Sequence, residues 1–124
     1  MTQEEKEFLL QDLCSRLPYG VKCQFEDTIE VIKEIWFCED EGWQVDGEKT
    51  STCIHAVKPY LFPMSSMTEE QSKIYHELVG GMFGTGVLIN LDCLIVFLNR
   101  NHLDWRGLIP MGLALDATGL GIYE

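Results

Sequence analysis

The hydrophobic residues of this chain change their spacing twice, and this change restricts the fold more than any other feature. The first 17 residues carry apolar side chains at helical spacing, with Leu9, Leu13 and Leu17 on one stripe. From Val21 to Val57 the chain is rich in β-branched and aromatic residues separated by short polar turns, and helical spacing returns after residue 66. Strands that follow one another without helices between them predict an α+β fold with an antiparallel sheet.

The start of the first helix has two signals. Thr2 is a good N-cap, and Glu5 lies three residues later, as a capping box requires. Pro18 and Gly20 are expected to end the helix. The leucine stripe should then be buried, and the polar side chains on the other face should point to water; these are Glu4, Glu7, Gln11 and Asp12.

The middle of the chain contains several segments with strand character. In VKCQFE, Val21, Cys23 and Phe25 alternate with polar residues, as in a half-buried strand. The segments TIEVIKEIWF, WQVD and TSTCIHAV follow, divided by turns at 26–27, 39–42 and 46–48. TIEVIKEIWF also fits a helix, because Ile29, Ile32 and Trp36 have helical spacing. Short turns favour hairpins, so we expect an antiparallel meander of three to four strands.

The segment KPYLFP, residues 58–63, follows the strand region. Pro59 and Pro63 remove two backbone donors, which predicts an extended connector at the surface or at a sheet edge rather than a further central strand.

Two to three helices are expected in the C-terminal half. Ser66 or Thr68 can cap the first, which should stop at Gly80-Gly81 in a glycine-rich turn that includes Gly84 and Gly86. Asn90 can cap LDCLIVFLNRNH, which is apolar nearly all round and is expected to be the central buried helix. A last short turn, WRGLI, can be capped by Asp104. No linker divides the chain, so residues 1–124 form a single domain in this interpretation.

The charge of the chain excludes several classes of partner. Nine basic residues against 20 acidic ones give a formal net charge of -11, which disfavours binding to nucleic acid or to an anionic membrane surface. The opening residues MTQEEKEF resemble no secretory signal, so we expect a cytoplasmic protein. Residues 78–99 are the most apolar stretch, but Asp92 near its middle argues against a membrane span.

The five cysteines do not have the pattern of a disulfide framework, because their number is odd and no CxxC pair occurs. We expect all five thiols to be free, with Cys14, Cys23, Cys53 and Cys93 as small core residues. A metal site could start from Cys53 and His55, whose spacing puts both on one face of a strand, with Cys23 alongside. No second close ligand pair exists, so no metal or other cofactor is predicted.

Three motifs in order suggest a family. They are RLPYGVKCQ at 16–24, VKPYLFPMSSMTEEQ at 57–71 and HLDWRGLIPMGLALDA at 102–117. Together they resemble a family of small uncharacterised proteins encoded by gut anaerobes and their phages. This resemblance implies an accessory gene of a mobile element and supplies no activity, cofactor, partner or functional residue.

Side chains that donate, accept and stack are densest at His102, Asp104, Trp105 and Arg106. A structural corner, in which Asp104 caps a turn and Trp105 packs, is one interpretation of this cluster. The other is partner recognition, since Tyr, Trp and Arg are the residue types that most often carry binding energy. Under the second interpretation Tyr60 and Phe62 of the proline-bracketed connector join the same interaction surface.

No complete catalytic signature is present, because the glycines at 80–86 lack phosphate-loop spacing and each Cys-His pairing needs a tertiary coincidence. We therefore expect a small acidic protein that binds another protein, not an enzyme, and a homodimer is left open. A first alternative is an acidic mimic of nucleic acid that uses Glu26-Asp27, Glu39-Asp40-Glu41 and Asp46-Glu48. A second alternative is a small metal-binding domain or enzyme.

Overall fold

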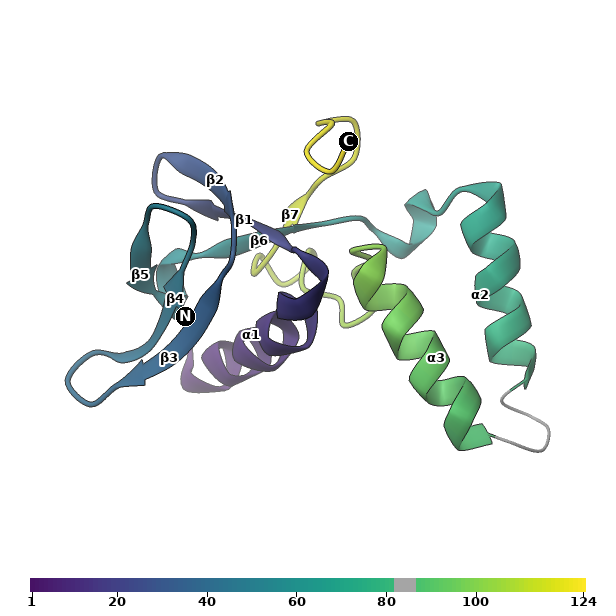
Figure 1. Ribbon diagram of the computed structural model, residues 1–124, viewed down its shortest axis with the longest axis horizontal. Coiled ribbons are helices and arrows are strands. Elements are labelled where there is room, and N and C mark those ends of the chain that lie inside the picture. Colours follow the sequence, from purple (N-terminus) through teal and green to yellow (C-terminus); the bar gives the residue numbers. More distant parts are fainter. Residues whose placement is uncertain (82–86) are drawn as a thin grey trace.

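The computed structural model describes residues 1–81 and 87–124, so Gly84 and Gly86 of the expected glycine-rich turn lie outside the described residues. The N-terminal helix, the antiparallel strands and the further helices confirm the α+β class (Figure 1). The helices are α1 (Gln3–Arg16), α2 (Glu69–Gly81) and α3 (Val87–Arg100). The strands are β1 (Lys22–Phe25), β2 (Thr28–Val31), β3 (Glu34–Cys38), β4 (Gly42–Asp46), β5 (Ser51–Cys53), β6 (Lys58–Leu61) and β7 (Leu115–Asp116).

The strands form two sheets in place of one meander. β3, β4 and β5 make an antiparallel three-stranded meander, whereas the four-stranded sheet has the order β2-β1-β6-β7. Its β1–β2 and β1–β6 pairs are antiparallel, and its β6–β7 pair is parallel. The segment TIEVIKEIWF supplies both β2 and β3, because the chain leaves the first sheet at Ile32 and enters the second at Glu34.

The prediction for KPYLFP is wrong for its first four residues, since Lys58–Leu61 forms β6, an interior strand of the sheet, and not a surface or edge connector. β1 pairs with Lys58 and Pro59, while β7 pairs with Tyr60 and Leu61. Each neighbour uses a different half of β6, so the proline lies in a pairing only two residues long and interrupts no continuous ladder. Pro59, Tyr60 and Leu61 are all buried.

α1 follows its sequence signals at both ends. The Thr2 hydroxyl accepts a hydrogen bond from the Glu5 amide and the Glu5 carboxylate accepts one from the Thr2 amide, so the capping box is confirmed. The helix ends at Arg16, and after a short turn Gly20 takes a positive φ of 70°. Leu9 and Leu13 are fully buried as expected.

Asp12 was expected to face water, and this prediction is wrong. Its side chain is fully buried, because it pairs with two arginines.

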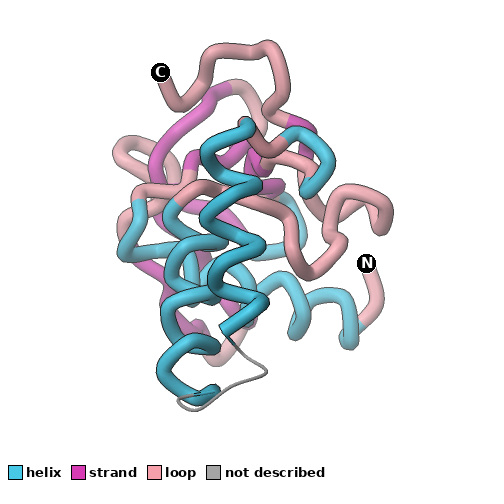
Figure 2. Tube along the Cα trace, turned by 90° about the vertical axis from the view of Figure 1, so that its right-hand side faces the viewer, coloured by secondary structure: helices cyan, strands magenta, loops and turns pink. Residues whose placement is uncertain are grey.

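Two hydrophobic clusters hold the chain together. The first lies between α1 and the strands and includes Leu9, Leu13, Phe25, Val45 and Leu61. The second joins the α2–α3 pair to the segment after β6; its members are Leu94, Leu98 and Leu103, with Phe62, Met64, Met67, Tyr75, Leu78, Val79, Phe97 and Trp105 packed around them. Figure 2 shows α2 and α3 side by side, in front of the strand region.

α3 is not the central buried helix that its composition predicted. Leu94, Leu98 and Asn99 are buried, but Leu91, Asp92, Cys93 and Arg100 are exposed. The helix begins at Val87, which places Asn90 inside it rather than at its N-cap. α3 packs at the side of the molecule, against α2 and the segment that follows β6, so one side has no covering element among the described residues.

The N-cap of α2 is Thr68, one of the two expected residues. The Gln71 amide donates to the Thr68 hydroxyl, and the Thr68 amide donates to the Gln71 side chain. These reciprocal bonds make a second capping box.

Candidate functional site

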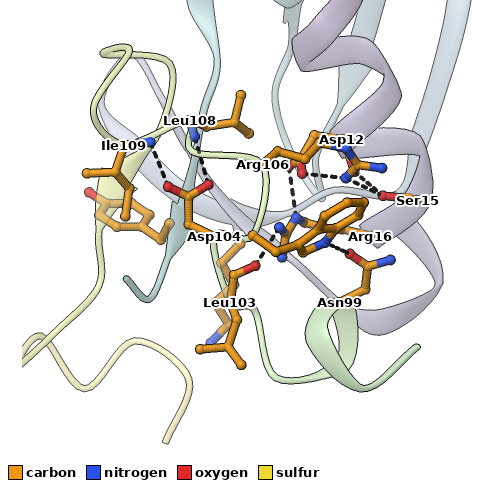
Figure 3. Close-up of polar contacts among 12 residues, drawn as sticks. Asp12, Ser15, Arg16, Asn99, Leu103, Asp104, Arg106, Leu108 and Ile109 are labelled. Atoms are coloured by element: carbon orange, nitrogen blue, oxygen red, sulfur yellow. Dashed lines mark hydrogen bonds and ion pairs between the residues drawn. The ribbon is translucent and has the colours of Figure 1, made fainter. Parts of the chain in front are cut away.

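The side chains of α1 and of the segment 103–106 meet in a buried polar network (Figure 3). Arg16 Nε donates to Asp12 Oδ2 at 2.8 Å, and Arg16 Nη2 donates to the Leu103 carbonyl at 2.7 Å. Arg106 Nη1 donates to Asp12 Oδ1 at 2.8 Å and to Ser15 Oγ at 3.1 Å. One carboxylate therefore compensates two guanidinium groups and ties α1 to the C-terminal segment.

Asp104 caps the turn that follows it, as the sequence indicated. Its carboxylate accepts hydrogen bonds from the Leu108 and Ile109 amides, at 2.8 and 2.9 Å (Figure 3). Its own amide donates to the Phe62 carbonyl at 2.8 Å. The side chain is buried, so its oxygens are committed to the backbone of its own chain.

Trp105 and Arg106 contact each other and the end of α3. The Arg106 guanidinium lies 4.0 Å from the centroid of the Trp105 ring, which is the geometry of a cation–π contact. Trp105 Nε1 donates to Asn99 Oδ1 at 3.0 Å. Both side chains are half-buried and have polar partners within the chain.

Tyr123 near the C-terminus covers His102. The two rings stack with centroids 3.8 Å apart and an interplanar angle of 13°. The Tyr123 hydroxyl donates to the Tyr60 carbonyl at 2.6 Å and accepts from the Lys22 amide at 2.9 Å. Burial raises the pKa of this hydroxyl above its ordinary value. Sequence reasoning missed Tyr123, because its partners lie 63 and 101 residues away.

His102 is held as a neutral ring. Burial lowers its pKa from 6.5 to about 4, and the positive charges of Arg16 and Lys22 act in the same direction. Its Nδ1 atom is buried and has no hydrogen-bond partner among the described residues. The backbone adopts a positive φ of 57°, an uncommon conformation for a residue other than glycine.

The structure brings the six residues of the predicted interaction surface to one region. Tyr60 is buried and its hydroxyl donates to Gln24 Oε1 at 2.8 Å, while Phe62 packs in the second hydrophobic cluster. All six contact other parts of the same chain, so their geometry is that of a supporting corner; these are Tyr60, Phe62, His102, Asp104, Trp105 and Arg106. A role in partner binding stays a prediction for this corner.

A second region, on the β3–β4 hairpin, leaves large aromatic rings in solvent. Phe37 is 57% exposed, Trp43 is 40% exposed and Trp36 is 39% exposed. Phe37 and Trp43 are cross-strand partners whose ring centroids lie 5.3 Å apart in an edge-to-face arrangement. Trp36 points to the other face of the hairpin, where its Nε1 donates to Asp46 Oδ1 at 3.0 Å.

The β3–β4 hairpin also offers a free backbone edge. β3 pairs with β4 on one side, and no described strand pairs with its other side. An unpaired strand edge with exposed aromatic rings can pair with a further strand from another chain. The turn that follows β3 is acidic, with Glu39, Asp40 and Glu41, whereas at the start of the strand the exposed Lys33 offsets the charge of Glu34.

A cavity of about 250 Å³ opens beside these rings, between the hairpin and the first turns of α1. Phe37, Trp43, Leu10 and Ile54 supply its apolar wall. Its size fits one large side chain of a partner, and its rim includes the charged residues Lys6, Glu7 and Glu41.

Sequence reasoning did not select this surface. The signal was present in EIWFC, because consecutive side chains of a strand point to opposite faces and three large apolar neighbours cannot share one core. α1 covers Ile35 and Val45 of the same hairpin face, but Phe37 and Trp43 extend past this helix. Their exposure therefore depends on tertiary structure.

Within residues 1–81 and 87–124, no three His, Cys, Asp or Glu side chains are grouped so that they could hold a metal ion. The structure therefore offers no ligand set for the metal alternative. Cys53 ends β5, and its sulfur accepts a hydrogen bond from Gln44 at 3.3 Å. His55 lies in a 3-10 turn, Ile54–Ala56, and not on the strand that the sequence predicted, so the expected shared face does not exist.

The five thiols are free in the structure, but of the four that we expected in the core only Cys23 lies there, and Cys53 is half-buried. Only Cys23 is buried, while Cys14 and Cys93 are exposed. Burial of Cys23 raises the pKa of its thiol above the ordinary value, which leaves it unreactive.

The acids of the nucleic-acid-mimic alternative fall into separate groups. Glu39, Asp40 and Glu41 lie before β4, whereas Asp46 and Glu48 lie at its end and beyond. A strand of five residues holds two such groups about 15 Å apart. Asp46 is also engaged by Trp36 and Ser51. These residues therefore do not form the continuous acidic row that a nucleic-acid mimic would need.

A helix with enough apolar length to bridge a bilayer is absent from the part of the chain that the structure describes. Comparison with protein-family models, with curated proteins and with solved structures found no match. Any function assigned to this molecule therefore has to be argued from its own residues.

Proposed function

We propose that this protein acts by binding another protein, and that the β3–β4 hairpin is its binding surface. The observation that carries the proposal is the exposure of Trp36, Phe37 and Trp43 on one short hairpin. Aromatic rings are enriched among the residues that dominate interface energies. Leaving them in water has a cost that a partner would remove.

The hairpin favours a partner of a particular kind. Its free β3 edge can accept an extended segment as a further strand, with main-chain hydrogen bonds giving affinity. The acids of the turn at 39–41 favour a partner that carries Lys or Arg beside an apolar residue. That apolar side chain would enter the cavity beside Phe37 and Trp43.

The corner formed by Asp12, Arg16, Asp104 and Arg106 supports the fold in this proposal. Each charged group there already has a partner within the chain. The resemblance to proteins of gut anaerobes and their phages would make the partner a protein met by a mobile element, and this context rests on the resemblance alone.

Affinity capture with matched variants tests the proposal. The full chain, the double variant Phe37→Ser/Trp43→Ser and the control Leu120→Ser are immobilised in equal amounts, since Leu120 is as exposed as Phe37, at 57%. We expect the wild type and the control to retain the same protein and the double variant to lose it, with unchanged thermal midpoints. Equal retention by all three, or no retained protein, would contradict the proposal.

A further inference from the structure

α3 is almost uncharged, and yet some of its apolar side chains are exposed. Twelve of its 14 residues carry no charge, and Asp92 and Arg100 are the exceptions. Leu94 and Leu98 bury one side in the second cluster, whereas Leu91 remains 36% exposed and Cys93 is also exposed. A helix that is apolar on all sides is usually covered on all sides.

The uncovered side forms part of an open groove between α2 and α3, with a volume of about 650 Å³. Ile74, which is 37% exposed, stands on the α2 wall, and Val96 and Phe97 stand on the α3 wall. An apolar groove of this kind can receive the apolar face of a further helix.

The charges along the α3 wall have an order that points to one occupant. Asp92, Val96 and Arg100 all line the groove at spacings of four residues, which keeps them near one face of the helix. The row is therefore acidic at Asp92, apolar at Val96 and basic at Arg100. If α3 of a second copy lies antiparallel to it, Asp92 of one copy meets Arg100 of the other, and the two Val96 side chains meet each other.

The spacing makes both ion pairs form together. Asp92 and Arg100 are about 12 Å apart along the helix axis, and this separation is the same in each copy. No ion pair within the described part of the chain uses either side chain. The row is therefore complementary to itself under a two-fold rotation, as an interface between identical subunits requires.

We propose that this protein forms a homodimer in which the α3 helices of two copies pack antiparallel, with Val96 at the two-fold axis. Two α2–α3 pairs then make a four-helix arrangement that covers the exposed side of each α3. The segment from Glu69 to Arg100 carries four acids and two bases, so it holds only -2 of the net charge of -11. The charges that would repel a second copy therefore lie mostly outside this segment. The β3–β4 hairpin lies at the far end of the molecule and is not part of the dimer interface (Figure 1).

Charge reversal with rescue tests the dimer. Sedimentation equilibrium is run on the full chain, on Asp92→Arg, on Arg100→Asp and on the double variant with both changes. We expect the wild type to have twice the chain mass of 14.2 kDa. Each single reversal places like charges together at two symmetric positions and should raise the dissociation constant about tenfold or more. The double variant restores both pairs and should restore the dimer.

Lys73→Glu is the matched control, because Lys73 is exposed on α2 away from the groove and the substitution changes the net charge by the same amount as Arg100→Asp. It should leave the dissociation constant unchanged. A wild-type protein that is monomeric at about 0.5 mM, far above the dissociation constants of stable dimers, overturns the proposal. A dimer that neither reversal weakens, or that the double variant fails to restore, also overturns it.

Cross-linking provides a second test that does not depend on charge. In a background where the exposed Cys14 and Cys93 are serine, Val96→Cys places two thiols at the axis. Oxidation with diamide should give a covalent dimer, because thiols at the axis come within bonding range. Met111→Cys, at a position that is 46% exposed and outside the groove, should stay monomeric. Equal cross-linking of both variants contradicts the placement of the axis.

Discussion

At the scale of single residues, Asp12 is the side chain on which most depends. It is fully buried and compensates Arg16 and Arg106 together. Asp12→Ala leaves two guanidinium groups without their counter-ion, so we expect a loss of about 3–5 kcal/mol in the free energy of unfolding. Urea denaturation measures it, with the exposed Gln11→Ala on the same helix as control. A loss as small as that of the control would show that Asp12 is not the centre of the network.

Glu30 makes the stability depend on acid pH. Its carboxylate accepts hydrogen bonds from the Thr28 and Thr50 hydroxyls and from the Lys49 and Thr50 amides, and these lower its pKa from 4.5 to about 2. The folded state therefore favours the ionised form. The stability that Glu30 contributes is fully present above pH 4.5 and is lost as the pH falls towards 2.

Urea denaturation of the wild type and of Glu30→Gln at pH 6 and at pH 2.5 checks this dependence. The difference in stability between the two proteins should be large at pH 6 and much smaller at pH 2.5. A difference that is the same at both pH values would show that the hydrogen bonds to Glu30 do not distinguish its protonation states.

His102 makes the stability depend on pH in a higher range than Glu30 does. Its pKa of about 4 in the folded chain lies below the ordinary 6.5, so the unfolded state binds a proton first. Stability is therefore lost as the pH falls from 6.5 towards 4. His102→Asn accepts the positive φ of this position and carries no titrating ring. The variant should lose less stability than the wild type between pH 7 and pH 4.5; equal losses would contradict this role.

At the scale of helices and strands, the capping box of α2 is a local feature with a measurable effect. Thr68→Ala removes the side-chain acceptor of the Gln71 amide and should cost about 1 kcal/mol of stability. Thermal or urea denaturation measures the loss. Ser72→Ala, inside the same helix, should change stability by less than about 0.5 kcal/mol. If both substitutions have the same effect, the cap contributes nothing specific.

Local signals predicted the elements that depend on neighbouring residues. The caps at Thr2 and Thr68 and the alternation of Val21, Cys23 and Phe25 need only short-range chemistry, and all are present in the structure. β6 could not be predicted in the same way. Whether Pro59 interrupts a ladder depends on which strands lie beside it, and β7 comes from 54 or more residues further along the chain.

At the scale of the whole molecule, long-range pairings decided what the sequence left open. Asp12 has the pattern of a solvated helix residue, but Arg106, 94 residues away, buries it. The cluster at 102–106 was found from its chemistry, and the structure supplies the intramolecular partners that its residues use. The exposed hairpin was not found, because exposure of a strand depends on what the rest of the chain fails to cover.

The central claim is that the β3–β4 hairpin binds a partner while the corner at residues 102–106 supports the fold. Hydrogen exchange of the full chain, free and in complex with the protein that it captures, tests both parts in one measurement. The β3 amides that point away from β4 should exchange quickly in the free chain, because the outer edge has no paired strand within the described residues. In the complex, new protection should appear across residues 34–46 and should be absent at 102–106. New protection at 102–106, with residues 34–46 unchanged, would contradict the account.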